Sequence, residues 1–267
     1  MIRTRTAALR AAALPLAVIV AACGGAPAAP ALTDPNEIIV KSFETLQGAK
    51  SVHLEVGLAG SLTADLFGTG TATEFPLDTT TLNGDLDLAN DRARVTFDVP
   101  ALLGLSGEVL VIGETSYVKT SLTGPLYQKS TNDGATEDVP SDPAEAIAEL
   151  RTALEETEGL DPVKGADVAC GEKQCYSVDL TLDPSLLSGL GEGAPIPVGE
   201  LPADGSATVT FHVEKDTLRL AELIVAASAA GQGDITLTLT LTKWDEGVAI
   251  DEPQADQVTE GGGMFGG

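Results

Sequence analysis

The stretch Gly233-Asp-Ile-Thr-Leu-Thr-Leu-Thr-Leu-Thr-Lys243 alternates apolar and hydroxyl side chains from Ile235 to Thr242. Successive side chains of a β-strand point to opposite faces of its sheet, so this period of two predicts a strand with one apolar and one polar face. An antiparallel sheet built from such strands buries one face and leaves the other to water.

The same period recurs over much of the chain. Val52, Leu54, Val56 and Leu58 alternate with polar or small residues, and further alternating runs are separated by turn residues such as Asn90-Asp91. Short connections predict antiparallel neighbours, and roughly ten strands are too many for a flat open sheet, so we expect the sheet to curl. These further strands are expected at 66–75, 82–88, 92–99, 107–112, 116–120, 174–182, 206–213 and 217–227.

Two helices are expected beside the strands. Asp34-Pro35 supplies an acidic cap and a proline at the first helical position of a helix that ends at Gly48. Ser141-Asp142-Pro143 opens a second helix that ends near Gly159. The order helix, strands, helix, strands predicts an α+β fold, with one large curved antiparallel sheet whose concave face the two helices cover.

The amino terminus is typical of an exported protein. Three arginines precede an uncharged apolar run, 11–22, that is too short to span a membrane but has the length of a signal-peptide core. The following Val20-Ala21-Ala22-Cys23 resembles the bacterial lipobox, which implies cleavage before Cys23 and acylation of that residue. The alternative is an ordinary secreted protein with a chance cysteine at this place.

These features predict four regions along the chain. Residues 1–22 are a signal peptide, 23–33 a lipidated flexible tether, 34–258 one domain, and 259–267 a disordered Gly-rich tail. We therefore expect an extracytoplasmic protein of the cell envelope, held at the cell membrane by its lipid anchor.

The charge balance limits the partners. The net charge is −25, and it becomes more negative once the arginines of the signal peptide are removed. Such an acidic surface repels nucleic acid, so no nucleic-acid partner is expected, and membrane attachment should depend on the acyl chains.

The two remaining cysteines lie close together as Cys170-Gly-Glu-Lys-Gln-Cys175. In an oxidising compartment this spacing is typical of a local disulfide, whereas a metal site would need two further ligands nearby.

Catalytic motifs are weak. Ser116 and Lys119 match a Ser-x-x-Lys nucleophile motif, but on a strand these positions point to opposite faces. Asp85, Asp87 and Asp91 lack the glycine and the glutamate of a calcium loop. We expect no enzyme, no metal and no cofactor.

Several segments of the chain have a characteristic order and spacing: Gly84-Asp-Leu-Asp-Leu88, Asp98-Val-Pro100, Ser116-Tyr-Val-Lys119, Tyr127, and the last strand with Trp244-Asp-Glu246 and Val248. In this order they resemble the LppX/LprG-type lipoproteins of mycobacteria. The resemblance implies a half-barrel similar to the lipoprotein carrier LolA, with an apolar cavity on its concave side. It also implies binding of the acyl chains of lipids or glycolipids, their transfer across the envelope, and a membrane exporter as a further partner.

The expected function is therefore a membrane-anchored lipid carrier. The alternative is a structural or sensory envelope lipoprotein that binds a protein partner without lipid. Inward-facing strand residues are the candidates for the cavity wall, although each could equally belong to a packed core: Leu54, Val56, Leu58, Leu86, Leu88, Val95, Phe97, Val109, Val111, Val178, Leu180, Val209, Phe211, Leu237 and Leu239.

Overall fold

The computed structural model describes residues 31–64, 72–102, 104–131, 147–148, 151–152, 154, 159–182, 205–229 and 233–260. Leu32–Gly267 form a compact unit separate from Met1–Ala31. The expected signal peptide, Cys23 and most of the tether lie outside the described residues.

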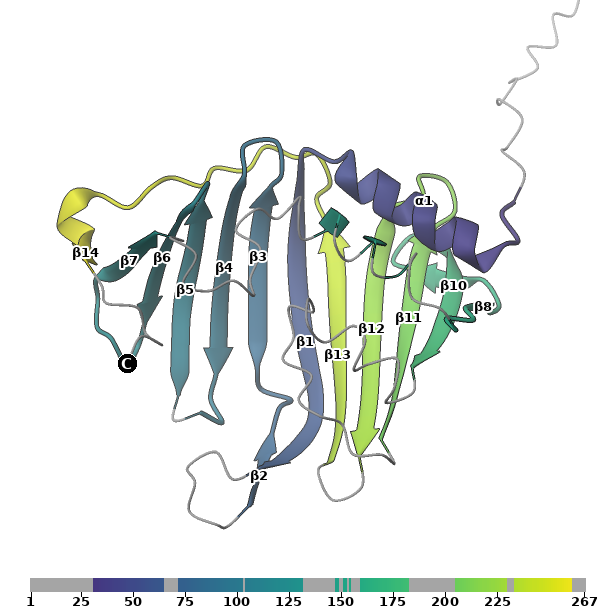
Figure 1. Ribbon diagram of the computed structural model, residues 1–267, viewed down its shortest axis with the longest axis horizontal. Helices are drawn as coiled ribbons and strands as arrows, with labels where there is room; N and C mark the ends of the chain where they lie inside the picture. The colour runs from purple at the N-terminus through teal and green to yellow at the C-terminus, as the bar shows by residue number, and fades with distance from the viewer. Residues whose placement is uncertain are drawn as a thin grey trace, which may run out of the picture. The chain divides into compact units, whose positions relative to one another are not determined.

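The strands form a single sheet (Figure 1). In the described part of the chain the strand order is β14-β7-β6-β5-β4-β3-β1-β13-β12-β11-β10-β8, with β2 paired to β1 and β9 paired to β10. All of these pairs are antiparallel except β14 with β7. The bounds are β1 Ser51–Ala64, β2 Thr73–Pro76, β3 Thr81–Asp87, β4 Arg92–Val99, β5 Leu105–Ile112, β6 Thr115–Thr120, β7 Tyr127–Thr131, β8 Val163–Lys164, β9 Val168–Cys170, β10 Lys173–Leu182, β11 Ser206–Glu214, β12 Leu220–Ala229, β13 Gly233–Thr242 and β14 Val258–Glu260.

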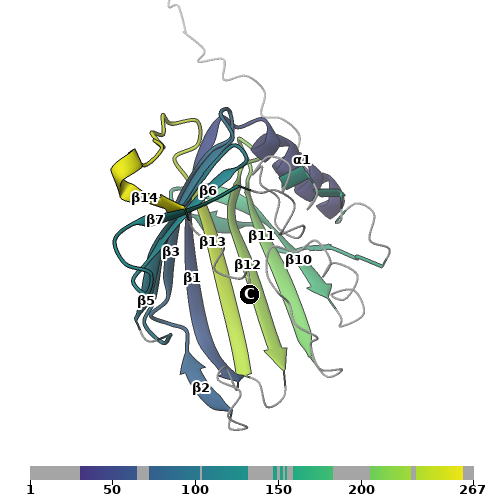
Figure 2. The same ribbon diagram turned by 60° about the vertical axis from the view of Figure 1, so that its left-hand side comes forward.

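The large curved antiparallel sheet is confirmed. Its curvature is visible in Figure 2, where β3 to β7 lie at an angle to β10 to β13. Most of the alternating runs became strands with ends close to those expected. β1 continues to Ala64, beyond the run that ends near Leu58, and β2 is shorter than expected, in a region where 65–71 lie outside the described residues. The short strands β7, β8, β9 and β14 were not expected, because they are too brief to show a period. β14 includes Thr259 and Glu260, which lie in the segment that the sequence analysis assigned to the tail.

Helix α1 (Pro35–Gln47) has the limits that its capping residues predict. Asp34 Oδ1 accepts a hydrogen bond from the backbone N–H of Asn36 at 2.9 Å, and Gly48 is the C-cap. The helix lies against β10, β11 and β12 and buries its apolar stripe there.

Of the second expected helix, the structure describes only residues 147, 148, 151, 152 and 154, all of them helical. Ile147 and Leu154 pack against the same core cluster as α1. The described part therefore contains one complete helix, where the sequence predicted two.

The pairing of β1 with β13 ends at Gly60. On its other edge β1 pairs with β3 as far as Gly57, and Ser61–Ala64 pair with β2. Gly60 has φ +97°, and a Cβ atom there would lie 2.0 Å from the carbonyl oxygen of Asp234. Only glycine fits this close crossing of two backbones.

A second apolar cluster lies on the opposite face of the sheet and fixes the C-terminal segment. Leu110, Tyr117 and Tyr127 pack against Ile250 there. The Tyr117 hydroxyl donates to Glu252, and Arg92 Nη1 donates to the carbonyl oxygen of Ile250 at 2.6 Å. The segment after β13 is thereby held across the sheet as far as β14.

A partly buried carboxylate, that of Glu108, accompanies this cluster. The Tyr127 hydroxyl donates to Glu108 Oε2 at 2.6 Å, Lys119 Nζ lies 3.2 Å from the same oxygen, and Arg94 Nε lies 3.3 Å from Oε1. Burial alone would raise the pKa of Glu108, but the hydrogen bonds from Tyr127 and Lys119 and the two positive charges outweigh it, so the pKa is lowered. Hydrogen bonding to Tyr127 in turn raises the pKa of Lys119.

Candidate functional site

One face of the sheet carries an unbroken row of apolar side chains. Directly opposed residues of antiparallel strands point to the same face, so the register shows which side chains are neighbours. The longest row runs from β10 to β4 through Val178, Phe211, Leu223, Leu239, Val56, Leu82 and Phe97.

Three further rows flank it on the same face. Together the four rows contain every candidate that the sequence proposed for the cavity wall, apart from Leu88. The flanking rows are Leu180, Val209, Val225, Leu237 and Leu58; Leu241, Leu54, Gly84, Val95 and Val109; and Val52, Leu86, Ala93 and Val111. We call these four rows the apolar face.

Leu88 is the one predicted wall residue that lies outside these four rows. It lies one residue beyond the end of β3, in the turn to β4, and belongs to neither described core cluster. The alternation continues through the turn in the sequence, but the strand ends at Asp87, so the period of two no longer decides where Leu88 points.

The apolar face differs in burial from one end to the other. Under α1, Val178 is fully buried, and Phe211 is 2% exposed with its ring edge-on to Phe43 at a centroid distance of 6.4 Å. Toward β3, β4 and β5, Val95, Phe97 and Val109 are only partly buried. The α1 end is therefore packed core, while the same rows continue beyond the helix as a less completely covered wall.

Two glycines shape this wall. A Cβ atom on Gly107 would lie 2.6 Å from Cζ of Phe97, and one on Gly84 would lie 3.1 Å from the Leu54 side chain. The Phe97 ring and the Leu54 side chain therefore lie over their glycine partners in the neighbouring strands. The large side chains can lie flat along the sheet, which gives the wall a continuous aliphatic and aromatic surface.

A pocket of about 310 Å³ opens at the covered end, between α1 and β10. Among the predicted residues only Leu180 lines it. The sequence analysis missed the other wall residues, because it chose its candidates from the strands alone and named none from the helices or from 160–162. The complete lining is Asn36, Ile39, Val40, Phe43, Arg151, Leu154, Leu160, Pro162 and Leu180.

The pocket is apolar with two polar groups in its lining. Arg151 Nη1 donates to Gln47 Oε1 at 3.0 Å, which places the guanidinium beside the end of α1, and Asn36 lies in the first turn of that helix. A volume of this size is at the lower end of small-molecule pockets, and such pockets combine apolar walls with a few polar groups. This composition suits an amphipathic molecule with an apolar chain.

Outside the second apolar cluster, the opposite face of the sheet carries polar side chains. His53 Nδ1 lies 2.7 Å from Asp85, and His212 Nδ1 lies 2.7 Å from Glu222. Ser116 pairs with Val111 of the apolar face, whereas Lys119 pairs with Glu108 of the polar face. The expectation that the Ser-x-x-Lys pair is split between the two faces is confirmed.

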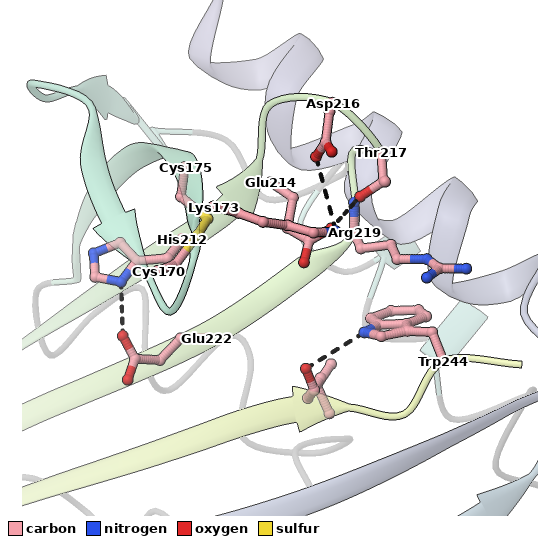
Figure 3. Close-up of a disulfide and its surroundings, with 11 residues drawn as sticks. Cys170, Lys173, Cys175, His212, Glu214, Asp216, Thr217, Arg219, Glu222 and Trp244 are labelled. Atoms are coloured by element: carbon pink, nitrogen blue, oxygen red, sulfur yellow. Dashed lines mark hydrogen bonds and ion pairs between the residues drawn. A yellow bond between two sulfur atoms is a disulfide. The ribbon is translucent and has the colours of Figure 1, made fainter. Parts of the chain in front are cut away.

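The disulfide Cys170–Cys175 closes the turn between β9 and β10 (Figure 3). Neither cysteine lines the pocket. Next to it Lys173 pairs with Glu214 at 2.6 Å. The single tryptophan, Trp244, packs against the main core, and the Arg219 guanidinium lies 5.4 Å from its ring centroid. These contacts stabilise the end of the sheet on which α1 rests.

Within the described residues, no helix has the length and the apolar character that crossing a membrane requires. No protein-family model matches the chain, and no curated protein is similar to it in sequence.

Solved structures do share its fold. LprF from Mycobacterium bovis superposes with a TM-score of 0.53 at 18% identity, covering 84% of this chain and 98% of its own. The Mycobacterium tuberculosis lipoprotein LppX gives a TM-score of 0.50 at 18% identity, covering 81% of this chain and 98% of its own. The half-barrel fold implied by the sequence resemblance is therefore confirmed.

Proposed function

We propose that this chain is an LppX/LprG-type lipoprotein that binds the acyl chains of lipids and carries them within the cell envelope. The observation that supports it best is the apolar face, which continues from the packed core under α1 to the partly buried wall at β3 to β5. A sheet that only needed a core would gain nothing from extending that face by several strands. Binding of acyl chains is driven by burial of apolar area at about 25 cal/mol per Å².

The pocket gives the proposal a more specific form. An acyl chain lies along the apolar face, with one end in the pocket between α1 and β10 against Phe43 and Leu180. Asn36 and Arg151 are the polar groups that the pocket offers to such a ligand. Binding is non-covalent. The 18%-identical LprF and LppX share the fold on which this arrangement depends.

The test is native mass spectrometry of the full chain, purified from membranes without harsh detergent, combined with lipid transfer between vesicles. Val40 lines the pocket but does not belong to the buried core, so Val40→Trp should fill the pocket and leave the fold intact. Val163→Trp is the matched control, because Val163 is 63% exposed and does not line the pocket.

We expect lipid on the wild type and on Val163→Trp, and loss of most of it on Val40→Trp. If the wild type carries no lipid and transfers none, the carrier function is wrong, and the alternative of an envelope lipoprotein that binds only a protein partner becomes the better account.

The membrane anchor is a separate part of the proposal. Cleavage before Cys23 and acylation there would place the domain outside the cytoplasm, on the surface of the cell membrane. In cells grown with an alkyne-labelled palmitate, we expect label on the wild type and none on Cys23→Ala, which should leave the membrane fraction. Equal label on both proteins would exclude Cys23 as the acylated residue.

A further inference from the structure

Two neighbouring turns at one end of the sheet expose leucines to solvent. Leu102 lies in the turn between β4 and β5 and is 37% exposed. Leu122 and Leu126 lie in the turn between β6 and β7 and are 69% and 40% exposed. We call these three leucines the apolar tip; Figure 1 shows the strands from which both turns project.

Hydrogen bonds hold the two turns side by side. The backbone N–H of Ser121 donates to the carbonyl oxygen of Ser106 at 2.7 Å. The Ser121 hydroxyl donates to the carbonyl oxygen of Gly104 at 3.2 Å and accepts from the backbone N–H of Ser106 at 3.1 Å. The exposed leucines are thus carried on two turns that are hydrogen-bonded to each other.

The tip is uncharged although the chain as a whole is strongly acidic. The segments 99–107 and 120–126 contain no charged residue, whereas 21% of the chain is charged and the net charge is −25. The acidic surface repels anionic headgroups, so an uncharged apolar projection is the part of this domain best suited to enter the interfacial layer of a membrane. A binding site for a protein partner usually has a polar or charged rim that matches the partner's charges, and the two segments of the apolar tip contain no charged residue.

The apolar face runs directly into the tip. Phe97 pairs with Gly107, and the next pair on the same face toward the tip is Val99 with Leu105. The turn that carries Leu102 joins these last two residues. An acyl chain that left a membrane at the tip would therefore meet apolar side chains without a polar interruption.

We propose that the apolar tip inserts into the surface of a lipid bilayer and is the point at which acyl chains pass between that bilayer and the apolar face. The second half of this statement rests on the proposed carrier function, and the first half does not. Leu32, the first described leucine of the expected tether, lies toward the opposite edge of the sheet from the tip. Its backbone N–H donates to the Tyr176 hydroxyl on β10. Docking through the tip is therefore a contact separate from the anchor.

The test uses residues 32–267, the compact unit that contains every described element, so that no acyl anchor contributes. Leu122→Cys is labelled with an environment-sensitive fluorophore and mixed with vesicles of neutral phosphatidylcholine. Val163→Cys, equally labelled, is the control, because Val163 is 63% exposed but lies on β8 at the far edge of the sheet.

We expect the emission of the probe at 122 to shift to the blue on addition of vesicles and to be quenched by lipids with brominated acyl chains, with no change at 163. The unlabelled double variant Leu122→Ser/Leu126→Ser should bind the vesicles at least about tenfold more weakly, because buried leucines drive such insertion.

No response at 122, or an equal response at both positions, would overturn the proposal. So would a response at 122 to another envelope protein in the absence of any response to vesicles. The carrier function is measured separately, by native mass spectrometry. Bound lipid without insertion of the tip would refute only the proposed docking site. Insertion of the tip without bound lipid would refute only the proposed carrier function.

Discussion

Two phenylalanines in one row of the apolar face should differ in what they contribute to stability. Phe211 and Phe97 lie in the row that crosses from β10 to β4, but Phe211 is covered by α1 and Phe97 lies beyond it, over Gly107. If the two ends of the face have different roles, Phe211→Ala and Phe97→Ala should have different costs.

The magnitudes follow from the contacts. Truncation of a buried phenylalanine costs roughly 3–5 kcal/mol, and the edge-on contact of Phe211 with Phe43 adds to its share, so we expect about 4 kcal/mol for Phe211→Ala. Phe97 is only partly buried, and its ring covers a glycine, so Phe97→Ala should cost about 2 kcal/mol. For a domain of this size the midpoint temperature of unfolding should fall by about 8–16 °C for Phe211→Ala and by about 4–8 °C for Phe97→Ala.

The assay is urea denaturation of delipidated residues 32–267, followed by the fluorescence of Trp244, the only tryptophan. Delipidation is essential, because a bound ligand stabilises the folded state by mass action and would hide the difference. An unchanged slope with urea would show that both variants unfold between comparable states.

Acyl-chain binding supplies the second readout. Phe97→Ala should weaken the binding of a fluorescent fatty acid more than its small effect on stability would suggest. Equal losses of stability for the two variants, together with unchanged binding for Phe97→Ala, would refute the reasoning, because the whole face would then be ordinary packed core.

Two further predictions concern stability. Because the pKa of Glu108 is lowered in the folded state, its ionised carboxylate stabilises the fold fully above pH 4.5, and this stabilisation is lost as the pH falls through the folded-state pKa. In urea titrations, the difference in unfolding free energy between the wild type and Glu108→Gln should therefore shrink below pH 4.5. A difference that stays constant with pH would contradict this prediction. Gly60→Ala should destabilise the protein strongly, because the new Cβ atom would lie 2.0 Å from the Asp234 carbonyl oxygen. Gly57→Ala is the control and should be nearly neutral, because a Cβ atom there has nothing within 4 Å. Equal midpoint temperatures of the two variants in thermal melts would argue against the close crossing.

Much of the fold could be predicted because local spacing decides it. The alternation in Ile235–Thr242 placed the leucines of β13 on one face and its threonines on the other, and the Asp34-Pro35 cap and Gly48 gave the limits of α1. The strands β8 and β9 could not be found this way. They have two and three residues, and they exist because β10 is there to pair with them.

The candidate site was predictable only in part, for a related reason. The period of two shows that a side chain points to the apolar face, but Val178 and Val95 have the same local pattern and very different burial. The pocket depends on Val40 and Leu160, which belong to neither a strand nor an alternating run. Their role arises where α1 and the segment before β8 approach β10.

The sequence by itself determined that the strands are two-faced and antiparallel, because alternation and turn chemistry are properties of a few consecutive residues. Only the tertiary structure decided which part of the apolar face is core and which part is wall. That distinction depends on where α1 comes to rest across β10 to β12, and on the insertion of β1 between β3 and β13. Contacts between residues more than a hundred positions apart decide both, and no short stretch of sequence carries that information.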